Sequence, residues 1–183
     1  MAVSSTVPLL LTLTVLCCLL PTPLFLSAAA EKTQLAIEVC KNTTDFNFCR
    51  QSIYSDPRAP TADRVVLASI TFTNAYFNAT DTRDYIASQI KLIGGGGNPD
   101  IIKGLKSCLG NYNEAVRAIN EVLGDLNDES YYDFDKLSLD AEKNLRACEN
   151  GFHGRSPITQ RNVVAIKLAN ICYVVSKLFQ YND

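Results

Sequence analysis

Charge is missing from residues 1–30 of this 183-residue chain. Within this segment, residues 7–26 are almost entirely apolar or small, and Ala28 and Ala30 satisfy the small-x-small rule of signal peptidase. A membrane anchor is the alternative, but prolines interrupt the apolar run and no basic stop-transfer cluster follows it. We therefore predict a signal peptide over residues 1–30, whose removal leaves Glu31 as the first residue of a secreted protein.

Runs of lysine or arginine are also missing. The 17 basic side chains are scattered among 19 acidic ones, and the formal net charge is −2. Without a basic patch, a nucleic acid is not expected as a partner. No second apolar segment is expected to span a bilayer, so no membrane association is predicted once the signal peptide is gone. Residues 31–183 are long enough to bury the core of one domain.

Histidine is nearly absent, since His153 is the only one, and no two cysteines form a C-x-x-C pair. A zinc site would therefore lack ligands, and neither a metal nor a cofactor is expected. His153 lies in a glycine-containing loop with no G-x-S-x-G serine motif elsewhere, and we interpret it as a solvated loop residue. Acidic pairs such as Asp133 and Asp135 are interpreted as solvated turn charges rather than a glycosidase dyad. The sequence predicts a protein that binds, not an enzyme.

Strand patterns of period two are missing from residues 31–183, where apolar residues recur at steps of three and four. Long helices are therefore predicted in four segments: 61–93, 99–126, 132–150 and from Pro157 onward. Thr61 is the predicted N-cap of the first helix, and Gly151 the C-terminal cap of the third. The four glycines 94–97 are interpreted as a turn, because no strand precedes them and no Lys-Ser/Thr pair follows as in a phosphate loop.

Four amphipathic helices joined by short loops favour an all-α, up-down four-helix bundle over residues 61–183. Residues 31–58 differ, because they contain only two short helical pieces and a turn with proline. We predict that they form an N-terminal α-hairpin ahead of the bundle.

The cysteines outside the signal peptide are five, an odd number: Cys40, Cys49, Cys108, Cys148 and Cys172. In a secreted protein, cysteines are expected to pair. Cys40 and Cys49 are nearest neighbours, and a bond between them would close the hairpin. Cys108 and Cys148 fall on the apolar faces of the second and third bundle helices, which lie next to each other. Cys172 is then left as a buried apolar thiol, with a reactive or intermolecular thiol as the alternative.

Two glycosylation sequons begin at Asn42 and Asn78. A glycan on Asn42 would place the tip of the disulfide loop in solvent. Asn78 would have to lie on the outer face of the first long helix, although its neighbours belong to the apolar stripe.

Several short motifs follow one another in a defined order along the chain. They are Cys40 to Cys49, Asp56-Pro57 with Thr61-Ala62-Asp63, Cys108-Leu109-Gly110-Asn111-Tyr112-Asn113-Glu114-Ala115, Leu137-Ser138 with Ala141, Cys148-Glu149, and Ser156-Pro157. In this order and spacing the chain resembles the plant invertase and pectin methylesterase inhibitor family, and within it the branch of small pollen-type proteins described as invertase inhibitors. The resemblance implies a four-helix bundle with an N-terminal α-hairpin and the two disulfides already inferred.

The resemblance also implies stoichiometric inhibition of a cell-wall carbohydrate enzyme, with a location in the apoplast or alternatively the vacuole. Invertase inhibitors of the family insert a Pro-Lys-Phe turn between the two disulfide-linked helices, whereas residues 127–136 of this chain lack that triplet. This absence favours occlusion of the pectin methylesterase substrate cleft, with invertase as the alternative target. A secreted helical binding protein without an enzyme target is a further alternative.

Candidate interface residues come from two segments. Tyr112, Asn113 and Glu114 occupy the position of the family's Tyr-x-Asp-Ala motif, and Tyr131, Tyr132 and Phe134 belong to the turn. An exposed Glu114 is expected to pair with a basic enzyme, which would make the complex pH-dependent. The N-terminal hairpin is a candidate contact for a homodimer.

Overall fold

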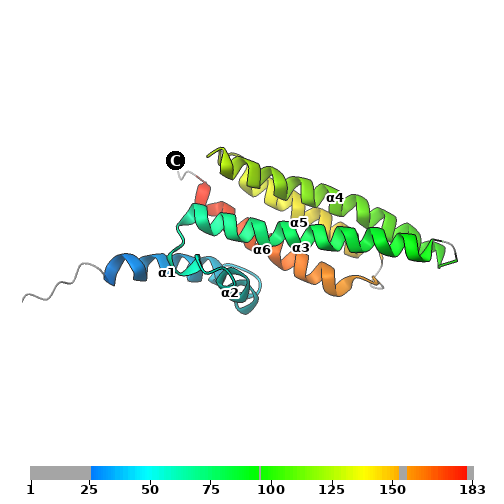
Figure 1. Ribbon diagram of the computed structural model, residues 1–183, viewed down its shortest axis with the longest axis horizontal. Coiled ribbons are helices and arrows are strands. Elements are labelled where there is room, and N and C mark those ends of the chain that lie inside the picture. Colours follow the sequence, from blue (N-terminus) through cyan, green and yellow to red (C-terminus); the bar gives the residue numbers. More distant parts are fainter. Residues whose placement is uncertain (1–25, 95, 153–155, 181–183) are drawn as a thin grey trace, which may run out of the picture.

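The computed structural model describes residues 26–94, 96–152 and 156–180, with side chains from residue 34 onward. Its elements in chain order are α1 (Leu26–Lys41), α2 (Phe46–Tyr54), the 3₁₀ turn η1 (Ala59–Thr61), α3 (Arg64–Ile93), α4 (Pro99–Asn127), α5 (Phe134–Asn150), α6 (Thr159–Ser176) and the 3₁₀ turn η2 (Lys177–Phe179). Figure 1 shows α3 to α6 lying side by side, with α1 and α2 beside one end of them.

The four long helices close into a ring of neighbours. Helix α3 contacts α4, α4 contacts α5, α5 contacts α6, and α6 returns to α3. Consecutive helices pack against each other because the loops between them are short, which gives the up-down topology. The apolar faces of these helices meet inside, where the largest enclosed side chains include Tyr112, Phe72, Phe134, Leu67 and Ile70. The predicted all-α bundle with an N-terminal hairpin is confirmed.

Local signals set most of the helix ends. Helix α3 stops at Ile93, before the glycines, and α4 starts with Pro99 at its first position after the N-cap Asn98. The prediction that Thr61 caps α3 is wrong. Asp63 is the cap, and its carboxylate accepts hydrogen bonds from Val65 N and Val66 N at 3.0 and 2.9 Å.

The N-terminal hairpin consists of α1 and α2, joined by a bond between Cys40 and Cys49 with the Cα atoms 5.4 Å apart. Helix α2 contacts both α3 and α6, and α1 contacts α6. The predicted cleavage point after Ala30 lies inside α1, so a chain that begins at Glu31 would begin within this helix.

Helix α6 corrects one expectation about membranes. The segment Thr159–Phe179 is long and apolar enough to cross a bilayer, with a mean hydropathy of 1.4, although no such segment was expected beyond the signal peptide. Half of its apolar window is buried inside the bundle, where α6 packs against α3 and α5. Its apolar character is that of a core helix.

Candidate functional site at the α4–α5 turn

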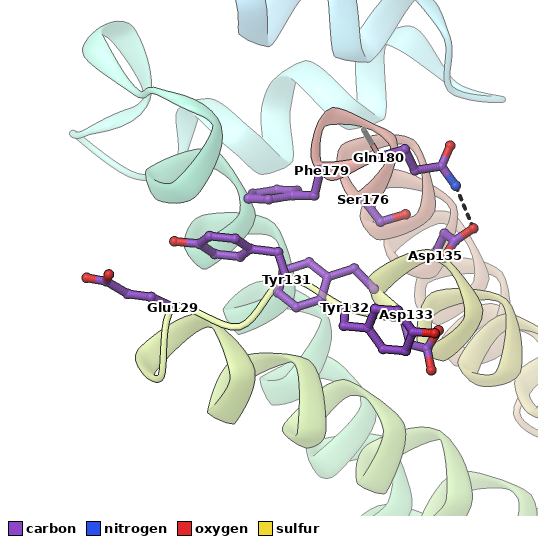
Figure 2. A pocket seen from close by; sticks show the side chains of 9 residues that line it. Glu129, Tyr131, Tyr132, Asp133, Asp135, Ser176, Phe179 and Gln180 are labelled. Carbon is purple, nitrogen blue, oxygen red and sulfur yellow. Dashed lines mark hydrogen bonds between the residues drawn. The ribbon is translucent and has the colours of Figure 1, made fainter. Parts of the chain in front are cut away.

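A groove opens beside the turn that joins α4 to α5, and it has a volume of about 590 Å³. Figure 2 shows its lining side chains, which come from the turn, the start of α5 and the end of the chain. They are Glu129, Tyr131, Tyr132, Asp133, Phe134, Asp135, Ser176, Phe179 and Gln180. The groove therefore brings together two segments that lie about forty residues apart in the sequence.

The turn has an unusual backbone for its sequence. Glu129 and Asp133 adopt left-handed conformations with φ of 55° and 61°, although neither is glycine. Such residues are held there by their surroundings at a cost on the order of 1 kcal/mol each. Ser130 N donates to Asp125 O at 2.8 Å, and Leu137 N donates to Asp133 O at 2.9 Å, so both ends of the turn are tied to the helices.

An aromatic cluster anchors the turn at Tyr131. The Tyr131 ring lies 4.9 Å from the Phe179 ring and 5.8 Å from the Phe134 ring, measured between centroids. Phe134 also packs against Phe179 at 5.1 Å and against Phe72 of α3 at 6.0 Å. Aromatic pairs at these distances add stabilisation beyond the area they bury. The turn is thus fixed to α3 and to η2 through one group of rings.

A polar anchor holds the other side of the turn at Asp135. Its carboxylate accepts hydrogen bonds from Lys177 Nζ at 3.2 Å and from Gln180 Nε2 at 2.7 Å, and the second of these is drawn in Figure 2. Partial burial acts to raise the pKa of Asp135, but the Lys177 ammonium and backbone N–H groups outweigh it and leave the pKa below its usual value.

Tyr132 lies in the sequence between the anchors at Tyr131 and Asp135, and 80% of its surface is exposed. Asp133 lies next to Tyr132, whereas the Glu129 carboxylate lies on the other side of Tyr131 (Figure 2). An amphipathic ring held on a fixed backbone is a common centre of protein interfaces. The geometry is suited to binding another protein, and the described residues contain no group of three His, Cys, Asp or Glu side chains that could hold a metal ion.

Two predicted interface residues are buried, and these predictions are wrong. Phe134 is 2% exposed and belongs to the aromatic cluster. Tyr112 is 0% exposed, and its hydroxyl donates to Asn162 Oδ1 at 2.7 Å. Burial raises the pKa of the Tyr112 hydroxyl well above its usual value, which keeps it neutral and able to donate. Neither side chain can touch an enzyme in the folded protein.

Tyr112 belongs to a buried polar network around the second disulfide. Cys108 and Cys148 are bonded with their Cα atoms 4.5 Å apart, so this predicted pair is also present. Asn162 Nδ2 donates to Glu149 Oε2 at 2.6 Å, and Thr159 Oγ1 donates to Glu149 Oε1 at 2.6 Å. The network joins α4, α5 and α6, and it explains the Tyr112 and Cys148-Glu149 motifs as structural features.

Asn113 and Glu114 are exposed, but they lie far from the turn. They lie about 20 Å from the C-terminal end of α4, because an α-helix rises 1.5 Å per residue along its axis. The Glu114 carboxylate accepts a hydrogen bond from Arg117 Nε at 3.1 Å, one turn further along the helix. The interface candidates that are not buried therefore divide into two surfaces: the helix face with the exposed Asn113 and Glu114, and the turn with the half-buried Tyr131 and the exposed Tyr132.

The remaining predicted positions differ in exposure. Asn42 is exposed at the hairpin tip. Asn78 is half-buried in α3, and its Oδ1 atom is enclosed without a hydrogen-bond partner. Cys172 is an unbonded buried thiol whose pKa is strongly raised by burial, which disfavours the reactive alternative. His153 lies outside the described residues.

The sequence did not indicate several residues of the site, among them Phe179 and Gln180 of the groove and Arg64, whose guanidinium carbon lies 5.2 Å from the centroid of the Phe179 ring. Phe179 and Gln180 follow the last helical stripe, and Arg64 is the first residue of α3. The only sequence signal was the concentration of aromatic residues near both the turn and the end of the chain.

Known proteins share both the sequence pattern and the fold. The family model described as plant invertase/pectin methylesterase inhibitor matches residues 35–176. The cell wall / vacuolar inhibitor of fructosidase 2 of Arabidopsis thaliana is 33% identical over 157 residues, which are 82% of this chain and 84% of that protein. Pectinesterase inhibitor 2 of the same plant is 30% identical over 83 residues, or 45% of this chain and 46% of that protein.

The crystal structure of a mutant form of a pectin methylesterase inhibitor from Arabidopsis superposes with a TM-score of 0.68. It covers 79% of this chain and 96% of that one at 20% identity, a likeness that concerns the fold alone. With the family model matched over most of its length, the chain belongs to the plant invertase/pectin methylesterase inhibitor family.

Proposed function

We propose that this protein is a secreted inhibitor of a cell-wall or vacuolar fructosidase, that is, an invertase. The observation that carries this choice is the 33% identity to a fructosidase inhibitor over most of both chains, whereas the similarity to a pectinesterase inhibitor spans under half of each. It reverses the order of targets that the missing Pro-Lys-Phe triplet suggested. Membership of a family of inhibitors supports an inhibitory role rather than an enzymatic one.

The α4–α5 turn is the proposed contact with the enzyme. It lies between the two helices that the Cys108–Cys148 bond joins, where the resemblance places the inserted turn of invertase inhibitors. Tyr132 would take the place of the missing triplet at the tip. Because both flanks of the turn are already anchored, little conformational entropy is lost on binding, and the contact area contributes more fully to affinity. Inhibition then results from occlusion of the active site.

The test is a titration of a plant acid invertase with the oxidised mature protein. We expect residual activity to fall to a stoichiometric endpoint, and Tyr132→Ala to raise the inhibition constant by about thirtyfold, as for a central interface tyrosine. Leu92→Ala is the matched control, because Leu92 is 76% exposed but lies at the far end of α3. An unchanged inhibition constant for Tyr132→Ala would exclude the turn as the contact.

Pectin methylesterase is the second candidate target. The missing Pro-Lys-Phe triplet supports it, and so does the exposed α4 face with Asn113 and Glu114. A parallel esterase titration with wild-type protein and with Glu114→Gln tests this alternative. If the esterase alone is inhibited and Glu114→Gln weakens that inhibition, the α4 face replaces the turn as the interface. If neither enzyme is inhibited, the protein is a helical binding module without an enzyme target of these classes.

A further inference from the structure

Arg64 lies at the same end of the bundle as the α4–α5 turn, although more than sixty residues separate them in the sequence. It is the first residue of α3, and its side chain is exposed. Its guanidinium carbon lies 5.2 Å from the centroid of the Phe179 ring and 5.9 Å from that of the Tyr131 ring. Its Nη1 also donates to Leu178 O at 3.4 Å. The Arg64 side chain thus links the start of α3 to both the turn and η2.

We propose that Arg64 is a positioning residue for inhibition: by holding the Tyr131 ring against Phe179, it keeps the neighbouring Tyr132 in the conformation that binds the enzyme. This inference rests on the proposed function, and it adds a residue that neither the resemblance nor the turn sequence indicates. Arg64 itself is not assigned a contact with the enzyme.

The turn needs an external support because its own sequence does not specify its shape. Glu129 and Asp133 are left-handed without being glycine, and Asp133 makes no capping hydrogen bond to α5 with its side chain. Each of these features favours other backbone conformations in the isolated segment. Tyr131 lies between the two strained residues, so restraining its ring restrains the backbone on both sides of it.

On the Tyr131 side, Arg64 adds a contact to the ring packing against Phe179 and Phe134. Tyr131 is only half-buried, whereas its neighbours Phe134 and Phe179 are 2% and 5% exposed. A guanidinium over an aromatic face is attracted by the ring quadrupole, and the planar group can lie against two rings at once. Because Arg64 is exposed, replacing it opens no cavity in the core, and its effect on the turn can be separated from an effect on folding.

The experiment combines inhibition with amide exchange. Arg64→Ala is compared with Arg64→Lys and with the control Arg83→Ala, an arginine of α3 whose ion pair is to its chain neighbour Asp84. We expect Arg64→Ala to raise the inhibition constant by about three- to tenfold. Arg64→Lys should restore part of that loss, and Arg83→Ala should change nothing. The Ser130 amide, bonded to Asp125 O, should exchange faster in Arg64→Ala while amides in the middle of α4 keep their protection.

A double-mutant cycle with Tyr132→Ala separates positioning from general stability. If Arg64 acts through Tyr132, its replacement should have little further effect on inhibition once Tyr132 is alanine. Independent, additive losses would overturn the proposal. Unchanged Ser130 exchange in Arg64→Ala would also overturn it, and so would faster exchange with an unchanged inhibition constant. A wild-type protein that inhibits no invertase contradicts the proposed function instead, and the exchange measurement then decides alone whether Arg64 holds the turn.

Discussion

The N-terminal hairpin and the four-helix bundle each contain one disulfide, yet different contacts hold each of them in place. In the bundle, a continuous apolar core surrounds the Cys108–Cys148 bond and the buried network of Tyr112 and Asn162. The hairpin contributes only a small part of that same core, including Val39 and Ile53, and several of its ties to the bundle are polar. Lys167 Nζ donates to Asp45 Oδ2 at 2.8 Å, and Thr44 N donates to Asn170 Oδ1 at 2.9 Å.

The contacts that stabilise the bundle therefore differ in kind from several of those that attach the hairpin to it. Buried apolar area and a long disulfide loop stabilise the bundle globally. Polar contacts at the surface contribute little free energy each and respond to pH and salt. The hairpin should therefore loosen under conditions that leave the bundle intact, whereas damage to the bundle should unfold both.

The largest expected difference comes from removing the disulfides in turn. Cys108→Ala with Cys148→Ala opens a loop with a sequence separation of 40, and loop-closure entropy predicts a loss of about 4 kcal/mol of unfolding free energy. Cys40→Ala with Cys49→Ala opens a separation of only 9, for about 3 kcal/mol, confined mainly to the hairpin. Urea unfolding gives both values. A larger global loss from the hairpin pair would contradict the comparison.

A second, smaller effect is expected from the buried network. Tyr112→Phe removes the donor to Asn162 Oδ1 and leaves that oxygen enclosed without it, at a cost of about 1–3 kcal/mol in unfolding free energy. Tyr132→Phe is the matched control, because Tyr132 is exposed and should change stability by less than about 0.5 kcal/mol. Equal effects of the two substitutions, measured by urea unfolding, would mean that the network does not contribute.

The attachment of the hairpin should depend on pH through Asp45. Its hydrogen bond from Lys167, and then the backbone N–H of Phe48, hold the pKa of Asp45 below its usual value. A lowered pKa in the folded state means that the stabilisation is present above the ordinary carboxyl pKa of about 4 and is lost as the pH falls. We expect the protection factor of the Cys49 amide, bonded to Asp45 O, to fall at acid pH, after the pH dependence of intrinsic amide exchange has been divided out.

Asp45→Asn should show low protection of the Cys49 amide at neutral pH already, and little further change in that protection on acidification. The effect should be smaller than that of Tyr112→Phe and should leave exchange in the bundle unchanged. A parallel loss of protection in the hairpin and the bundle would show that the two regions open together.

The smallest effect on folding is expected from replacing the asparagines of the two glycosylation sequons. Asn42 is exposed on the hairpin, whereas the Asn78 amide oxygen is enclosed in the bundle. We predict a glycan on Asn42 and none on Asn78 in protein secreted from plant cells. Asn42→Gln should remove the carbohydrate mass with little change in stability, and Asn78→Gln should leave the mass of carbohydrate unchanged. A glycopeptide that contains modified Asn78 would contradict this assignment.

Much of the fold could be predicted because its signals are local. Apolar residues at steps of three and four marked the bundle helices, and glycines and prolines marked their ends within a few residues. The Thr61 cap failed for a local reason too, because Asp63 two residues later offers a carboxylate to two backbone N–H groups. Both disulfides followed from the order of the cysteines along antiparallel neighbours.

The candidate site was predicted only in part. Tyrosine has an apolar ring and a polar hydroxyl, so its place in a sequence does not tell whether it faces the core or the solvent. Tyr112 and Tyr132 therefore looked alike as interface candidates, although one is buried and the other is exposed. Only the packing of α4 against α3 and α5, which buries Tyr112, distinguishes them.

By itself, the sequence determined a helical, disulfide-closed member of this inhibitor family, because periodicity, cysteine order and short motifs are properties of neighbouring residues. The tertiary structure alone decided how the α4–α5 turn is held. Arg64, Tyr131 and Phe179 meet there from three distant segments, and Asp135 meets Lys177 and Gln180. Such contacts depend on how the helices pack in space, and no spacing along the chain encodes them directly.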